Sequence, residues 1–177
     1  MTNADLPDER EKGGLLRCAR LVSDILGAES CEIIGGMALS AFGYVRGTLD
    51  ADFISKDDPG QILSSLRKNG FDCLLTWGDP EDSRPWVVRG DIEGVRFDIL
   101  PQIAGTRVER GTPLPGLGIR VCGVSDFIAL TCEAGGPQDL VDVTNLISVR
   151  PDLREEALQI AGDYGISHRL LLFLKPF

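Results

Sequence analysis

The sequence predicts an α/β (α+β) fold in which a mixed, twisted sheet is flanked by helices and the last third of the chain is helical. Short segments of alternating apolar residues predict strands at 48–54, 71–77, 86–90 and 94–100. An apolar segment that leads through Gly35-Gly36 into a helical pattern predicts the order strand, glycine turn, helix. After residue 125 the apolar spacing is helical, so the strands belong to the first two thirds.

The chain is expected to begin with an amphipathic helix. Its apolar residues recur at helical spacing up to the stop at Gly27, and they are Leu15, Leu16, Ala19, Val22, Ile25 and Leu26. Residues 31–34 then form a short buried strand in this interpretation. A further helix is expected over 61–68, because Pro59 and Gly60 precede it and Asn69-Gly70 follows it.

A hairpin and a long loop follow in the predicted order. The strands at 86–90 and 94–100 are separated only by residues 91–93, so we expect them to pair with each other. Residues 102–118 are rich in Gly, Pro and Thr and are predicted to form a loop. A short strand is expected after this loop, over 118–122.

The C-terminal third is expected to be a set of helices. Ser125 is predicted to cap the first of them. Gly and Pro residues separate the helical stretches, which cover 126–134, 139–147 and 154–165. We therefore expect residues 1–122 to form an α/β core and residues 123–177 to form a helical segment packed on it, in one compact domain.

The charge and the chain length limit the classes of function. A chain of 177 residues with a formal net charge of -9 repels a phosphate backbone, which disfavours bare nucleic acid as the main partner. A nucleotide remains compatible, because magnesium and backbone amides can neutralise its phosphates locally. The start has no apolar leader and the longest apolar run near the end is too short to cross a bilayer. We expect a cytoplasmic protein that does not bind membranes.

The five cysteines are expected to be reduced thiols in the core. Their number is odd, no two of them form a C-x-x-C pair, and each lies in or beside an apolar stretch: Cys18, Cys31, Cys73, Cys122 and Cys132. This pattern favours buried thiols over disulfides or a zinc site.

Three aspartates are the main candidates for chemistry. Asp50 and Asp52 alternate along one predicted strand, so their carboxylates point to the same side. Asp98 lies on another predicted strand that could pair alongside. Burying such a group without a cation is unfavourable, and hard oxygen ligands suit Mg²⁺ or Mn²⁺. Solvated aspartates on an exposed strand also produce a D-x-D pair, so the pair is not decisive alone.

Gly35-Gly36 gives that pair more weight. Between a strand and a helix, two glycines let the backbone approach a phosphate and direct amides at it. A tight turn is the alternative explanation. The combination and its order, rather than either motif, suggest neighbouring phosphate and metal sites.

The segment IIGGMALSAFGYVRGTLDADFI resembles the signature of the nucleotidyltransferase superfamily, in the branch of the AbiEii-type toxin-like proteins. The shared pattern is Gly-Gly, a helix, Arg-x-Thr, Asp-x-Asp and a later Asp. It falls here on Gly35, Gly36, Arg46, Thr48, Asp50, Asp52 and Asp98. The run VSDFIALTCEAGGPQDLVDV also resembles a helical segment of that branch, so the likeness covers about residues 30–147.

The resemblance implies a role for each of these residues. Gly35 and Gly36 would hold the triphosphate, while Asp50 and Asp52 would bind metal. Asp98 would activate an acceptor hydroxyl or complete the metal site. With Gly35 and Gly36, the nucleotide-binding set includes Arg46 and Thr48; Arg46 would contact a phosphate, or would instead form an ion pair that supports its loop.

Three further positions match or depart from that branch. Thr131 stands where the branch usually carries a lysine, which weakens the expectation of efficient catalysis. Asp139 and Asp142 match later acidic positions, although helix capping and a solvated helix surface are the simpler explanations. Trp77 and Trp86 flank a loop and could stack on a base, with core packing as the simpler explanation.

Two functions are consistent with these residues. The first is a metal-dependent nucleotidyltransferase that moves a nucleoside monophosphate from a nucleoside triphosphate to an acceptor hydroxyl of a protein, an RNA end or a small molecule. The second is a catalytically weak binding module that acts through a protein partner, as in toxin-antitoxin pairs. A protein partner or a homodimer is compatible with both.

Overall fold

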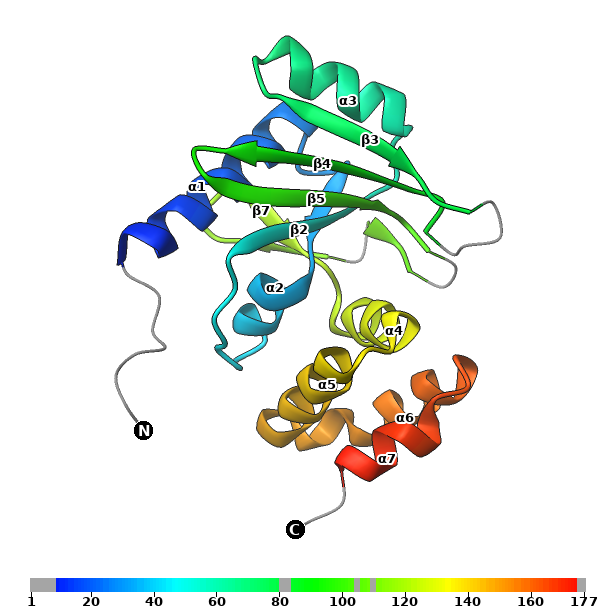
Figure 1. The fold of residues 1–177 in the computed structure, drawn as a ribbon. Helices are drawn as coiled ribbons and strands as arrows, with labels where there is room; N and C mark the ends of the chain where they lie inside the picture. Colours follow the sequence, from blue (N-terminus) through cyan, green and yellow to red (C-terminus); the bar gives the residue numbers. More distant parts are fainter. Residues whose placement is uncertain (1–8, 80–83, 104–105, 109–110, 175–177) are drawn as a thin grey trace.

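A seven-stranded mixed sheet forms the centre of the molecule (Figure 1). The structure is a computed structural model, and it describes residues 9–79, 84–103, 106–108 and 111–174. The strand order is β3-β4-β5-β2-β1-β7-β6. The strands are β1 (Cys31–Ile33), β2 (Asp50–Ser55), β3 (Cys73–Trp77), β4 (Trp86–Ile92), β5 (Val95–Pro101), β6 (Thr112–Leu114) and β7 (Ile119–Val121). The pairs β2·β5 and β1·β7 are parallel and the other neighbours are antiparallel.

The hairpin predicted between residues 86 and 100 is present. β4 and β5 pair antiparallel, with Ile92 opposite Val95. The two residues between them, Glu93 and Gly94, have φ angles of 55° and 84°. Positive φ at both central positions is typical of a type I′ turn, whose twist matches that of the strands it joins. The local sequence therefore sets the register that places Asp98 beside its neighbours.

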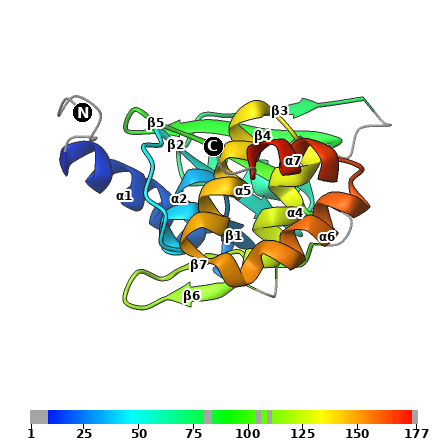
Figure 2. The same cartoon turned by 90° about the horizontal axis from the view of Figure 1, so that it is seen from below.

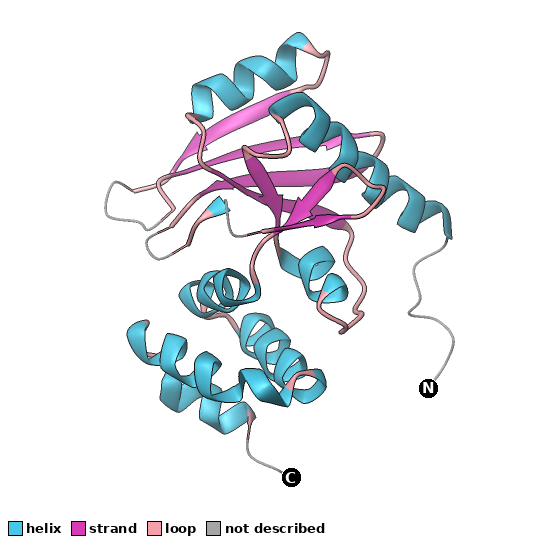
Figure 3. Ribbon diagram, turned by 180° about the vertical axis from the view of Figure 1, so that it is seen from behind, coloured by secondary structure: helices cyan, strands magenta, loops and turns pink. Residues whose placement is uncertain are grey.

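Two helices cover one face of the sheet (Figure 3). They are α1 (Glu9–Leu26) and α3 (Pro59–Lys68). An added Cβ on Gly14 of α1 would lie 3.2 Å from Val95, which shares a sheet face with the buried Phe97. Asp58 caps α3 by accepting hydrogen bonds from the amides of Gly60 and Gln61. The apolar side chains of alternate strand positions are buried under these helices, and the other sheet face is left for polar residues.

The remaining helices lie on the side of the polar face (Figures 1 and 2). α2 (Gly35–Ala41) contacts β2 and α4 (Val124–Ala134). Beyond α4 the chain forms α5 (Pro137–Val149), a 3-10 turn (Pro151–Leu153), α6 (Arg154–Asp163) and α7 (Ser167–Phe173). Together, α4 to α7 form the helical C-terminal third that the sequence predicts. Within the described part of the chain, no helix combines the length and the apolar character needed to cross a membrane.

Three local predictions were wrong. The stretch expected to be a loop contains β6, whose Pro113 is tolerated because β6 is an edge strand. Ser125 does not cap α4, because the cap residue is Gly123 and the Ser125 hydroxyl instead contacts Glu156 at 2.5 Å. Gly35 and Gly36 do not precede their helix, because α2 begins at Gly35.

The cysteines are buried thiols, as predicted. All are free, and each is at most 3% exposed: Cys18, Cys31, Cys73, Cys122 and Cys132. Burial raises the pKa of Cys18 and of Cys31 to about 12. Neutral thiols of this kind behave as small apolar groups, so the cysteines contribute to packing.

Candidate nucleotide and metal site

Asp52 and Asp98 are direct neighbours on the polar face of the sheet. β2 and β5 run parallel, and the register places Asp52 opposite Asp98. Neighbouring strands lie about 4.8 Å apart, and paired residues project to the same face. Asp50 lies on that face as well, two residues and roughly 6.6 Å along β2. The arrangement predicted from the alternation of TLDADFI is therefore present.

The charged form of Asp52 is the one that this arrangement disfavours most clearly. Its pKa rises to about 7, first because the side chain is buried and then because Asp50 and Asp98 lie nearby. Arg46 and Arg84 act in the opposite direction and only partly offset the effect. A carboxylate that is this unfavourable in its charged form would be stabilised by a bound cation.

The other two aspartates each have a fixed partner. The Thr48 hydroxyl donates to Asp50 Oδ1 at 2.9 Å, which orients that carboxylate. Arg89 on β4 is the register partner of Asp98 and donates to both of its oxygens, from Nε at 2.8 Å and from Nη2 at 2.6 Å. Such a fork is the strongest geometry for an arginine and a carboxylate. Asp98 is therefore neutralised by Arg89, whereas Asp52 is not.

Gly35 lies against Asp52. Its φ is +61°, and a Cβ added there would lie 2.5 Å from Asp52 Oδ2, so no other residue fits without displacing that carboxylate. Gly36 has a different neighbourhood, because its added Cβ would meet Thr48 at 2.8 Å and Arg46 Nη1 at 3.1 Å. The two glycines thus bring the start of α2 onto Asp52 and onto the Arg-x-Thr segment.

Arg46 forms the supporting ion pair that was one of its two predicted roles. Its Nη2 and Nε lie 2.9 and 3.0 Å from Asp142 Oδ2 on α5. The Asp142 side chain is only 5% exposed, and its other oxygen accepts a hydrogen bond from Gln138. Asp142 was expected to cap a helix or to lie on a solvated helix surface, and that expectation was wrong. Neither Arg46 nor Thr48 lines the pocket described next.

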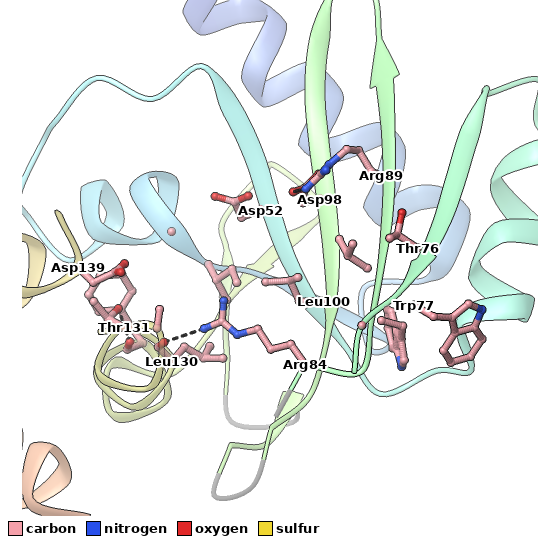
Figure 4. A pocket seen from close by; sticks show the side chains of 17 residues that line it. Asp52, Thr76, Trp77, Arg84, Arg89, Asp98, Leu100, Leu130, Thr131 and Asp139 are labelled. Atoms are coloured by element: carbon pink, nitrogen blue, oxygen red, sulfur yellow. Dashed lines mark hydrogen bonds and ion pairs between the residues drawn. The ribbon is translucent and has the colours of Figure 1, made fainter. Parts of the chain in front are cut away.

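A pocket of about 440 Å³ lies over Asp52 and Asp98, between the sheet and α4 (Figure 4). Asp50 and Gly36 are outside its lining. Its charged lining residues are Asp52, Asp98, Asp139, Arg84 and Arg89. Trp77 and Trp86 also line it. Trp86 is 8% exposed and belongs to the core, whereas Trp77 is 64% exposed, so core packing explains only Trp86.

The helical wall of the pocket contains Thr131 and Asp139. The Thr131 hydroxyl donates to the Phe127 carbonyl at 2.7 Å, so its proton is used within α4. Asp139 Oδ2 accepts the Gly136 amide at 2.9 Å at the start of α5, which confirms a capping role. Burial is the main cause that raises the pKa of Asp139. Asp139 therefore caps a helix and also faces the pocket.

Arg84 and Arg89 are the charged lining residues that the sequence analysis missed. Arg89 lies on a predicted strand with the alternation that would place it beside Asp98, so the hairpin register could have found it. Arg84 precedes β4 in a segment with no periodic signal, and its position depends on where α4 packs. No local pattern identifies it.

The donor set suits a hard divalent cation, although it is not assembled around one. Among the described residues, no group of three or more His, Cys, Asp and Glu side chains is placed to hold a metal ion. Both oxygens of Asp98 accept hydrogen bonds from Arg89. Asp50 and Asp52 fit Mg²⁺ or Mn²⁺ by chemistry and by the raised pKa of Asp52, and Asp98 would have to leave Arg89 to join them.

Solved structures share this arrangement of helices and strands. ANT(2'')-Ia, in complex with adenylyl-2''-tobramycin, matches with a TM-score of 0.60 over 86% of this chain and 99% of its own, at 14% identity. The solution structure of the antibiotic-resistance factor ANT(2'')-Ia matches with a TM-score of 0.61 over 90% and 95%, also at 14% identity. The chain has a nucleotidyltransferase fold. No protein-family model and no curated protein matches the sequence.

The nucleotidyltransferase fold confirms the predicted fold class. The predicted AbiEii-like branch is a finer assignment, and at 14% identity the likeness extends to the fold alone. That branch stays a prediction, as do the roles of the individual site residues.

Proposed function

We propose that this protein is a metal-dependent nucleotidyltransferase that moves a nucleoside monophosphate from a nucleoside triphosphate to an acceptor hydroxyl. The observation that carries the proposal is the pairing of Asp52 with Asp98 under a pocket, with Asp50 on the same face. Neighbouring carboxylates of this kind are unfavourable unless a cation or a proton joins them. The nucleotidyltransferase fold supports this interpretation.

Asp50 and Asp52 would hold Mg²⁺ or Mn²⁺. When bound, the metal would neutralise phosphate charge and favour displacement at phosphorus. Thr48 orients Asp50 by its hydrogen bond, and Gly35 leaves room for Asp52 by lacking a side chain. Asp98, once released by Arg89, would complete the metal site or accept the proton of the acceptor hydroxyl, while Arg89 would turn to phosphate oxygens.

The proposal does not specify the acceptor molecule, but the size and polarity of the pocket restrict which acceptors fit. Asp139 and the exposed Trp77 lie at different parts of the lining, so an acceptor with both polar and flat surfaces would fit. Tobramycin belongs in the set of acceptors to test, because a structural neighbour is bound to its adenylylated form. Proteins and RNA ends also belong in this set of acceptors to test.

A label-transfer assay tests the proposal directly. The protein is incubated with labelled nucleoside triphosphates, Mg²⁺ or Mn²⁺, and either cell lysate or a defined acceptor. Transfer of label by the wild type and no transfer by Asp50→Asn/Asp52→Asn is the expected result. The melting temperature gives a second readout. At a ligand concentration of about 100 Kd it should rise by roughly 5–10 °C for the wild type. An equal rise in the double variant would place the nucleotide elsewhere and reject the proposal.

A second candidate is the binding module that acts through a protein partner. Two observations favour it: Thr131 adds no charge to the helical wall, and Arg89 occupies both oxygens of Asp98. In that case nucleotide binding would persist without transfer to any acceptor. A stable complex with a partner protein and no label transfer would select this candidate.

A further inference from the structure

Arg84 is a pocket residue supplied by the connection between β3 and β4. It lies two residues before β4 and reaches across to α4, where its Nη2 donates to the Leu130 carbonyl at 3.0 Å (Figure 4). The same nitrogen lies 2.5 Å from Glu133 Oε2. The arginine side chain remains 27% exposed. Arg84 therefore lines the pocket from the sheet side and contacts the helical wall.

The charge of Arg84 acts on both sides of the pocket. It lowers the pKa of Asp52 on the sheet and that of Asp139 at the start of α5, against the larger effect of burial. Arg84 lines the same pocket as both carboxylates, which come from two different walls (Figure 4). A polyanion bound over Asp52 would lie within the same field.

The other arginines near the site, like Arg84, each have a carboxylate partner. Arg89 is held in a fork on Asp98, and Arg46 is paired with the buried Asp142 outside the pocket lining. Among the described lining residues, Arg84 and Arg89 are the cations. Thr131, beside the Leu130 carbonyl that anchors Arg84, is neutral and donates into its own helix.

We infer that Arg84, in the segment before β4, binds the triphosphate of the substrate. It places a positive charge next to the helical wall of the pocket, where Thr131 is neutral. The inference rests on the proposed function. A guanidinium presents five N–H donors in a planar fork that matches phosphate oxygens. A triphosphate with two divalent cations has no net charge, but Asp50, Asp52 and Asp98 on the sheet leave an excess of negative charge, which Arg84 offsets.

A purely structural role for Arg84 makes a different prediction. If Arg84 only anchors α4 through Glu133, removing either partner should have the same effect on nucleotide affinity. If Arg84 binds phosphate, Glu133 competes with the nucleotide for the guanidinium. In that case Glu133→Gln, which keeps the shape and removes the charge, should leave the affinity unchanged or increase it.

The test measures Kd by calorimetry for Mg-ATP, Mg-GTP, Mg-CTP and Mg-UTP. The proteins are the wild type, Arg84→Ala, Glu133→Gln and Arg84→Ala/Thr131→Lys, with the unliganded melting temperature of each as a folding control. For the triphosphate that binds the wild type, we expect Arg84→Ala to weaken binding by about tenfold or more. The added Thr131→Lys substitution should restore part of that loss, because it returns a positive charge to the pocket from α4. Arg84→Lys replaces Arg84→Ala if the latter does not fold, with a smaller loss expected.

The outcomes separate the two proposals. If none of the four nucleotides binds the wild type, the proposed function itself fails. If the wild type binds and Arg84→Ala binds equally well, only the role of Arg84 is overturned. Equal losses for Arg84→Ala and Glu133→Gln also overturn it, in favour of the anchor.

Discussion

Asp52 on β2 lies directly opposite Asp98 on the parallel strand β5, and Arg89 neutralises only Asp98. Asp52 is left as a partly buried, desolvated carboxylate beside Asp98 and Asp50, which explains why its pKa rises from 3.8 to about 7. Only one carboxylate of the pair, that of Asp98, has an arginine partner. This asymmetry leads to a pH prediction and a metal prediction.

Asp52→Asn should stabilise the metal-free protein in a pH-dependent way. Because the folded pKa lies above the unfolded value, Asp52 opposes folding increasingly as the pH rises from about 4 to about 7. The gain in free energy of unfolding should be small near pH 4 and roughly 2–4 kcal/mol above pH 7. Urea unfolding at several pH values measures it. Glu32, whose pKa burial also raises to about 7, is unchanged in both proteins and cancels in the difference. A gain that is constant with pH would contradict the prediction.

Arg89→Gln should increase the response of the protein to Mn²⁺. The substitution releases both oxygens of Asp98 and leaves the aspartates without a guanidinium, so a metal gains a ligand and loses a competitor. Arg89 is 58% exposed, so losing the pair should lower stability without metal by no more than about 1 kcal/mol. Melting temperatures with EDTA and with increasing Mn²⁺ measure both effects. Arg17→Gln, which removes another exposed ion pair outside the pocket lining, is the matched control. An unchanged or smaller Mn²⁺ shift would show that Arg89 and metal do not compete.

Arg46→Ala should destabilise the fold more than it weakens nucleotide binding. The substitution leaves Asp142, 5% exposed, without its guanidinium, and breaking such a pair lowers the free energy of unfolding by about 3 kcal/mol. Arg46→Ala/Asp142→Asn should recover part of the loss, and a double-mutant cycle measures the coupling. If Arg46→Ala folds as stably as the wild type and loses nucleotide affinity, Arg46 contacts phosphate after all.

Trp77 should report on ligand binding by its fluorescence. The chain has two tryptophans, and both line the pocket, but Trp77 is 64% exposed and Trp86 only 8%. A Mg-nucleotide that stacks on Trp77 should quench its emission and protect it from acrylamide. Trp77→Phe should lose this response with little change in stability, while Trp86→Phe should keep it. A response that survives in Trp77→Phe and vanishes in Trp86→Phe would reject the assignment.

The cysteines should resist thiol reagents in the native state. All five are buried, and burial raises the pKa of Cys132 to about 11 and that of Cys18 to about 12, so little thiolate is present at pH 8. A coloured disulfide reagent should therefore react only after unfolding in guanidinium. Rapid modification of the folded protein would show that at least one thiol is accessible.

The sequence by itself predicted the elements whose signals are local. Alternation in TLDADFI places Asp50 and Asp52 on one face, and helical spacing from Leu15 to Gly27 marks most of α1. Strand alternation and helix periodicity reflect which side of a single element is buried, so neighbouring residues contain the information. Asp98 was found by the same reasoning, because it lies in a strand with a clear apolar pattern. β6 was missed, since three residues that include Pro113 at an edge carry almost no pattern.

Only the tertiary structure decided which carboxylates Arg46 and Arg84 contact. Arg46 and Asp142 are 96 residues apart and meet because α5 packs against the segment that follows α2. Arg84 reaches Leu130, 46 residues away, because α4 lies against the end of the sheet. No local periodicity encodes which carboxylates Arg46 and Arg84 contact, because these contacts join elements far apart in the sequence. The sequence determined which acids share a face and, through the β4–β5 hairpin, that Arg89 lies beside Asp98. The packing of α4 and α5 determined which carboxylates Arg84 and Arg46 contact.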